Sequence, residues 1–169
     1  MWAQALVYGP LSSTERRSRL SGDTETEGVR FELRELVDSY ALGVDRKQVR
    51  EVAALFTAEG RLVTTFGPGT PETPVVRTGT DDITAALTEG LARYLCTTHI
   101  VGAHRAVVTA DSVTGETSCL AHHVYERAGE RRLLVMAVRY EDCFALQSGR
   151  WRFAERRLSV DWRTDTPLG

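Results

Sequence analysis

The sequence predicts an α+β fold, a cone-shaped α+β barrel in which N-terminal helices pack inside a curved, mostly antiparallel sheet. Apolar residues recur at helical spacing in the first half of the chain, up to about residue 96. Strand-type alternation follows, and the turn-like segments "DSVTG", "AGE" and "QSG" divide it into four long strands. A sheet bent around its own helices leaves one pocket, closed at its inner end, that suits a small apolar ligand.

The composition is that of a soluble globular protein. The chain has 169 residues, 42% of them hydrophobic and 26% charged, and no apolar run is long enough to span a membrane. A net charge of −2 argues against nucleic acid as the main partner. The three cysteines are far apart and odd in number, so neither a metal site nor a disulfide framework is expected. We therefore expect a cytoplasmic protein with a small-molecule partner and no cofactor.

The chain is expected to divide into two segments. Residues 1–28 carry Ser, Thr, Glu and Arg without a useful period, which predicts a mobile N-terminal leader. Residues 29–165 contain no internal repeat and no linker, so they are expected to form a single domain.

The first predicted helix covers residues 31–45. Its apolar stripe consists of Leu33, Leu36, Val37, Tyr40, Ala41 and Val44. A second helix is predicted over residues 45–60, with Gly60 at its end. Asp45 lies at the junction, where a carboxylate commonly caps the N-terminus of the following helix.

Further elements follow the second helix. Residues 61–67 are predicted to form a short strand that stops at a Gly- and Pro-rich segment. Residues 79–96 are predicted to form a third helix, with Thr80 as its N-cap. The four long strands are predicted over residues 98–111, 114–129, 131–149 and 150–162.

Histidines occur in two of these strands. His99 and His104 are five residues apart, so in a regular strand they point to opposite faces of the sheet. His122 and His123 are adjacent, so one of them faces inward. Small residues share a face with His123, which therefore suits a pocket, whereas His104 and His122 are predicted to lie on the outer face.

Four stretches carry a resemblance to a known family. They are "LVDSYALGVDRKQVREVAALFTAEG", "TGTDDITAAL", "TTHIVGAHR" and "SGRWRFAERRLSVDW". In this order they resemble the nuclear transport factor 2-like superfamily, more narrowly its SnoaL-like group, and within that group scytalone dehydratase. The resemblance runs from about residue 30 to residue 163. It implies the cone-shaped fold, but this superfamily includes dehydratases, isomerases, cyclases and non-catalytic subunits.

The resemblance implies catalytic roles for two residues. His99 matches the catalytic base of the dehydratases, although an ordinary strand histidine that is satisfied by its neighbours is the alternative. Asp45 matches the carboxylate that holds this histidine in the correct tautomer. Two other roles for Asp45 stay open, namely a helix cap and the base itself, as in related steroid isomerases.

Three further residues are weaker candidates. His123 matches a second active-site histidine and is assigned as a general acid or a substrate hydrogen-bond donor. Tyr40 is either a core aromatic residue or a donor to a substrate carbonyl. Arg139 would bind a carboxylate or enolate oxygen if it faces inward, and would otherwise be an outward charge.

Together these residues predict a cofactor-free lyase of the dehydratase type. His99 would remove a proton beside a carbonyl of a polyketide-like or aromatic molecule in secondary metabolism. One alternative is a SnoaL-like cyclase or isomerase, and another is a non-catalytic subunit such as a dioxygenase β subunit. Apolar residues on the outer face of the sheet, such as Leu120 and Val124, are compatible with a homodimer.

Overall fold

The computed structural model describes residues 13–65 and 73–169. The helices are α1 (Ser13–Asp45), α2 (Val49–Ala53) and α3 (Gly79–Ala92). The strands are β1 (Phe56–Thr65), β2 (Val75–Thr78), β3 (Tyr94–Val108), β4 (Val113–Arg127), β5 (Glu130–Gln147) and β6 (Arg150–Pro167). None of the helices in these ranges is both long and apolar enough to cross a membrane.

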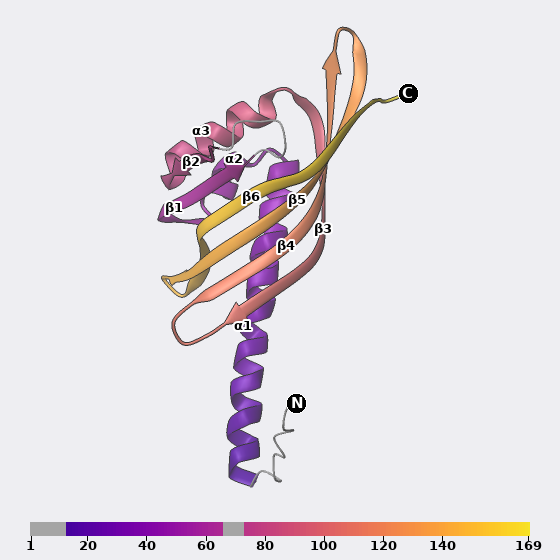
Figure 1. Cartoon of the computed structure of the whole chain (residues 1–169). Helices are drawn as coiled ribbons and strands as arrows, with labels where there is room; N and C mark the ends of the chain where they lie inside the picture. The colour runs from indigo at the N-terminus through magenta and orange to yellow at the C-terminus, as the bar shows by residue number, and fades with distance from the viewer. Residues whose placement is uncertain (1–12, 66–72) are drawn as a thin grey trace.

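The six strands form one curved sheet in the order β2-β1-β6-β5-β4-β3. Every neighbouring pair is antiparallel except β1 and β6, which are parallel. The sheet bends around α1, and its edge strands β2 and β3 do not pair with each other (Figure 1). The predicted α+β cone with its mostly antiparallel sheet is confirmed.

Helix α1 is longer than its apolar pattern predicts. It begins at Ser13 rather than at residue 31, and its N-terminal part projects beyond the sheet (Figure 1). Residues 13–28 contain no proline and several glutamates and arginines, which favour a helix without an apolar stripe. The residues of the predicted leader that precede Ser13 lie outside the described part, and the mobility of the leader stays a prediction.

The second helix is much shorter than predicted. Helix α2 ends at Ala53, and β1 already begins at Phe56, whose side chain is buried opposite Phe153 of β6. Gly60 therefore ends no helix. It lies at an irregularity in the β1–β6 register, where a Cβ would meet the Phe56 side chain at 2.8 Å. The close backbone approach explains this glycine.

Helix α3 confirms the third predicted helix, but it ends at Ala92 rather than at residue 96, because β3 begins at Tyr94. Its start also needs a correction. Its N-cap is Thr78 rather than Thr80, and Asp82 Oδ2 accepts a hydrogen bond from the Thr78 backbone N–H at 3.0 Å. Strand β2, directly before it, is not predicted, because four exposed or half-buried residues after a Pro-rich segment give too short a pattern.

Polar contacts fix α1 along strand β3. Arg34 Nη1 donates to the Gly102 carbonyl oxygen at 3.2 Å, and Asp45 accepts hydrogen bonds from β3 at the other end of this contact. Between them the predicted stripe of α1 is buried against the sheet, with Leu33, Val37 and Val44 at most 4% exposed. This packing places the last turn of α1 beside the first half of β3.

Candidate active site

Asp45 and His99 are in direct contact. Asp45 is the last residue of α1, and its Oδ1 accepts a hydrogen bond from His99 Nδ1 at 2.6 Å. The same carboxylate accepts two more hydrogen bonds, from the His99 backbone N–H at 2.9 Å and from the Thr97 hydroxyl at 2.8 Å. The N-cap of α2 is Gln48, so Asp45 is not the cap of the following helix.

These three donors hold Asp45 as a carboxylate. Burial alone would raise the pKa of Asp45, but the hydrogen bonds from His99 and Thr97 lower it below its ordinary value. With Nδ1 donating to the carboxylate, the imidazole carries its lone pair on Nε2. No described residue donates a hydrogen bond to Nε2, so this nitrogen is available as a base.

His99 lines a partly open pocket of about 200 Å³, which we call the chamber. Tyr40 of α1 and His123 of β4 line the same chamber, so three of the predicted site residues meet there. The remaining wall is mainly apolar and includes Val44, Leu91, Met136, Val138, Leu158 and Val160. An apolar chamber with a few convergent polar groups is the usual form of a small-molecule site.

The ring of His123 lies between two other rings. Its centroid is 5.5 Å from that of His99 and 4.4 Å from that of Tyr94. Burial, and next the charge that His99 acquires on protonation, lowers the pKa of His123 to about 4. At neutral pH His123 is therefore an uncharged imidazole, which suits a hydrogen-bond donor and not a cationic general acid.

Tyr40 lies on an arginine that the sequence did not point to. Arg156 of β6 is fully buried, and its guanidinium lies 4.3 Å from the ring centre of Tyr40 and 4.2 Å from that of Tyr140. Asp142 of β5 neutralises it through two hydrogen bonds of 2.8 and 2.9 Å. Burial raises the pKa of Tyr40, so its phenol stays protonated and can donate.

Asp142 could have been recognised from the sequence, and Arg156 could not. Asp142 alternates with Tyr140 and Phe144 on the inward face of β5. Arg156 is three residues beyond Phe153, and strict alternation would place the two on opposite faces. A register irregularity between β5 and β6 at this point brings both side chains inside.

A similar irregularity overturns the prediction for His104. The β3–β4 register shifts between Val101 and His104, so strict alternation fails between His99 and His104. The side chain of His104 lies opposite the buried Thr117, and its Nδ1 is 2.8 Å from the Thr117 hydroxyl oxygen. Both histidines of β3 thus face the interior, and His104 is not a residue of the outer face.

Arg139 does not face the cavity. It pairs in register with Ser118 of β4 and Ser159 of β6, and forms ion pairs with Glu116 and Asp161 at 3.3 and 2.9 Å. Its side chain is half exposed, while its neighbours Val138 and Tyr140 are buried. A substrate-binding role would require an inward orientation, so this prediction is wrong. The charged side chain of Arg139 points outward.

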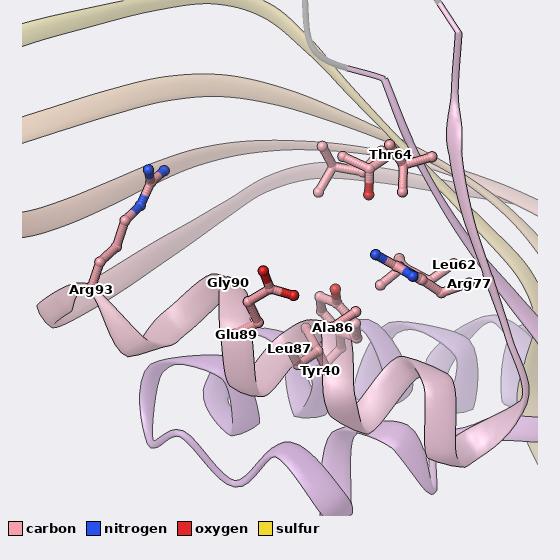
Figure 2. A pocket seen from close by; sticks show the side chains of 11 residues that line it. Tyr40, Leu62, Thr64, Arg77, Ala86, Leu87, Glu89, Gly90 and Arg93 are labelled. Atoms are coloured by element: carbon pink, nitrogen blue, oxygen red, sulfur yellow. The ribbon is translucent and has the colours of Figure 1, made fainter.

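A wider cleft of about 580 Å³ adjoins the chamber between α3 and strands β1 and β2. Tyr40, Leu87 and Arg93 line both spaces, so the cleft and the chamber share part of their walls. Figure 2 shows Arg93 and Arg77 on two sides of this cleft, with Glu89 projecting from α3 between them. Within the described ranges, no group of three or more His, Cys, Asp or Glu residues is arranged to hold a metal ion.

The fold and its chamber define a protein of the nuclear transport factor 2-like class. The SnoaL-like domain matches residues 29–157, and the chain therefore belongs to this family. Among curated proteins no sequence matches this chain.

Solved structures share this fold at low sequence identity. A provisionally named scytalone dehydratase from Novosphingobium aromaticivorans superposes with a TM-score of 0.70 at 21% identity, covering 88% of this chain and 93% of the other. ActVI-ORFA from Streptomyces coelicolor superposes with a TM-score of 0.63 at 20% identity, covering 79% of this chain and 98% of the other. The third structure is the β subunit of a provisionally assigned aromatic-ring-hydroxylating dioxygenase from N. aromaticivorans. It superposes with a TM-score of 0.65 at 18% identity, covering 81% of this chain and 92% of the other.

Proposed function

We propose that this protein is a cofactor-free lyase of the dehydratase type, acting on a small aromatic or polyketide-like hydroxy-carbonyl compound. The observation that carries the proposal is the 2.6 Å hydrogen bond between the Asp45 carboxylate and His99 Nδ1, with His99 lining an apolar chamber. A partly buried carboxylate–imidazole pair of this kind prepares a general base.

The proposed reaction is an elimination of water. His99 Nε2 takes the proton from the carbon beside the carbonyl, and the electron pair of that C–H bond becomes an enolate. The Tyr40 hydroxyl, and the His123 ring as a neutral donor, stabilise the enolate oxygen. Collapse of the enolate forms the carbon–carbon double bond and expels the hydroxyl group, which takes the proton from the His99 imidazolium and leaves as water.

Asp45 stabilises the imidazolium in this cycle. It is already ionised, and its other two hydrogen bonds prevent the carboxylate from rotating away from the ring. Because the pKa of His123 is about 4, His123 is not charged at neutral pH, so the proton for the leaving group comes from His99.

The test is turnover of a panel of β-hydroxy aryl ketones, followed by the absorbance of the conjugated product. Replacement of His99 by Ala should lower kcat/KM by about 10²- to 10⁴-fold, the usual contribution of a general base. Asp45→Asn should also lower it, because an amide does not stabilise an imidazolium. Asp38→Asn is the matched control, since Asp38 is a half-exposed carboxylate of the same helix that pairs with Arg34.

Wild-type turnover in the folded His99→Ala protein would contradict the proposal. A wild-type protein that accelerates no member of the panel, but isomerises or cyclises a related substrate through His99, would favour a cyclase or isomerase. A non-catalytic subunit is the rival from another class. The hydrogen-bonded pair of Asp45 and His99 favours an enzyme, because a scaffold does not need a base that faces a pocket.

A further inference from the structure

A second cleft, rich in arginine, opens beside the chamber. It has a volume of about 580 Å³ and lies where the ends of β4 and β6 meet the starts of β3 and β5. Its wall consists of Arg93, Tyr94, Tyr125, Arg127, Leu134, Arg163, Thr164 and Asp165. We call it the basic cleft, because three of these eight residues are arginines.

The three arginines of the basic cleft have no carboxylate at ion-pair distance within the described residues. Arg93 donates instead to the Tyr94 hydroxyl at 2.5 Å, and its guanidinium lies 4.8 Å from the centre of that ring. Besides these arginines, the wall of the basic cleft contains one charged side chain, the carboxylate of Asp165. The cleft therefore carries an excess of positive charge.

Both carboxylate oxygens of Asp165 already accept hydrogen bonds. Arg132 Nε donates to its Oδ1 at 2.8 Å, and the Tyr125 hydroxyl donates to its other oxygen. The hydrogen bonds from Tyr125 and Arg132, together with the charge of Arg127, lower the pKa of Asp165. Arg132 also pairs with Glu130 at 2.8 Å, so Asp165 offsets part of the positive charge of the cleft wall. Three arginines against this one carboxylate still leave an excess of positive charge.

The basic cleft adjoins the chamber that His99 lines. Arg93 and Tyr94 line both spaces, and Tyr94 packs on the ring of His123. Met136 of the chamber wall pairs in register with Arg163 of the cleft. The two spaces thus share part of their walls, which places the arginines next to the chamber.

From this arrangement we infer that the basic cleft binds an anionic group, a carboxylate or a phosphate, of the substrate whose apolar part occupies the chamber. The inference rests on the proposed function, because it assigns the substrate class of the same site. Arginine suits this role, since its planar fork binds carboxylate and phosphate oxygens in pairs.

The other cleft fits an anion less well. There Arg77 pairs with Asp82 at 3.5 Å, and the carboxylate of Glu89 projects into the space (Figure 2). The two clefts share Arg93, so Arg127 and Arg163 distinguish the basic cleft in an experiment.

The experiment is calorimetric titration of the full-length protein at low ionic strength with three small probes. They are benzoate, phenyl phosphate and neutral benzyl alcohol, which share an aromatic ring and differ in charge. At least one of the two anions should bind about 10- to 100-fold more tightly than the alcohol, as expected for hydrogen bonds to a charged group. Tighter binding of benzoate would identify a carboxylate, and tighter binding of phenyl phosphate a phosphate.

The preference should disappear in the double variant Arg127→Gln/Arg163→Gln and weaken as salt is added. Arg139→Gln, an exposed arginine of the outer face, and Arg77→Gln, in the other cleft, should retain it. Equal binding of the anions and the alcohol, or a preference that survives the double variant, would overturn the inference. So would loss of the preference in Arg77→Gln.

Titration of His99→Ala separates this inference from the proposed function, because binding of the probes needs no turnover. If His99→Ala keeps both wild-type activity and the anion preference, the proposed base is wrong while the basic cleft stands. If His99→Ala is inactive and neither protein prefers the anions, His99 remains the proposed base, but the inferred anionic substrate class is wrong.

Discussion

Asp45 and His99 are 54 residues apart in the chain, and their side chains meet because α1 ends beside β3. Residue type and local context made both residues candidates, and the resemblance to the dehydratases gave them their catalytic roles. Their contact could not be predicted from spacing, because it depends on how the helix docks on the sheet. The prediction that Arg139 shares a face of its strand with Val135 and Ala137 is correct. The sequence did not show that this face is the outer one.

His123 makes the stability of the protein depend on pH. Its pKa is about 4 in the folded chain and 6.5 in an ordinary histidine, so between these values the unfolded chain binds a proton that the folded chain does not. Its contribution is complete above pH 6.5 and is lost as the pH falls toward 4. The free energy of unfolding should therefore decrease by up to about 3 kcal/mol over this range.

Urea titrations at pH 7 and pH 4.5 measure this effect in the wild type and in His123→Phe. The pH dependence should be smaller in His123→Phe, because the titrating ring is absent while all other groups are shared. An equal decrease in both proteins would show that His123 is not the source.

At the scale of elements, long strands and amphipathic helices were predictable, and their ends and irregularities were not. Strands β3 to β6 follow the predicted order, because apolar alternation over many residues is a strong signal. The short β2 and the early start of β1 were missed. The shift in β3 before His104 reverses the inward and outward positions after it, and a single extra residue in a ladder leaves no clear mark in the sequence.

Gly43 tests the packing of α1 on α2. A Cβ at this position would lie 2.5 Å from Cγ2 of the buried Val52, a stiff β-branched side chain. Gly43→Ala should therefore lower the free energy of unfolding by about 1–3 kcal/mol. Gly28→Ala in the same helix is the matched control, since nothing lies within 4 Å of its added Cβ. It should raise the free energy of unfolding by about 0.5–1 kcal/mol.

The coupling between residues 43 and 52 is measured by urea denaturation of Gly43→Ala, Val52→Ala and the double variant Gly43→Ala/Val52→Ala. The second substitution removes the clashing methyl groups, so the double variant should lose less stability than the sum of the two single variants. Strict additivity would mean that the two helices do not contact each other at this point.

At the scale of the whole molecule, the outer face of the sheet carries an apolar row across four strands. Ile100, Leu120, Ala137 and Trp162 occupy directly paired positions on β3, β4, β5 and β6. Ile100, Leu120 and Trp162 are 55%, 39% and 53% exposed. Such a continuous apolar surface on a folded protein commonly marks an interface.

The homodimer expected from the sequence stays a prediction, and this row is where we place its interface. Leu120→Glu should convert a dimer into a monomer, because it would bury an unpaired charge in the centre of the row. Light scattering after size-exclusion chromatography measures the change. Leu146→Glu is the control, since Leu146 is also exposed but lies at the β5–β6 turn. A wild-type monomer, or a Leu120→Glu dimer, would contradict this interface.

The position of Asp45 has a consequence for the end of helix α1. The C-terminus of a helix carries partial negative charge, so a carboxylate there is unfavourable by roughly 0.3–1 kcal/mol, and the last turn of α1 contains no basic residue that would offset it. Among the described residues, only the three donors of β3 favour the anion at this point. If the helix end separates from the strand, Asp45 loses what keeps it ionised and becomes easier to protonate. Docking of this helix end and ionisation of the carboxylate are thus one coupled equilibrium.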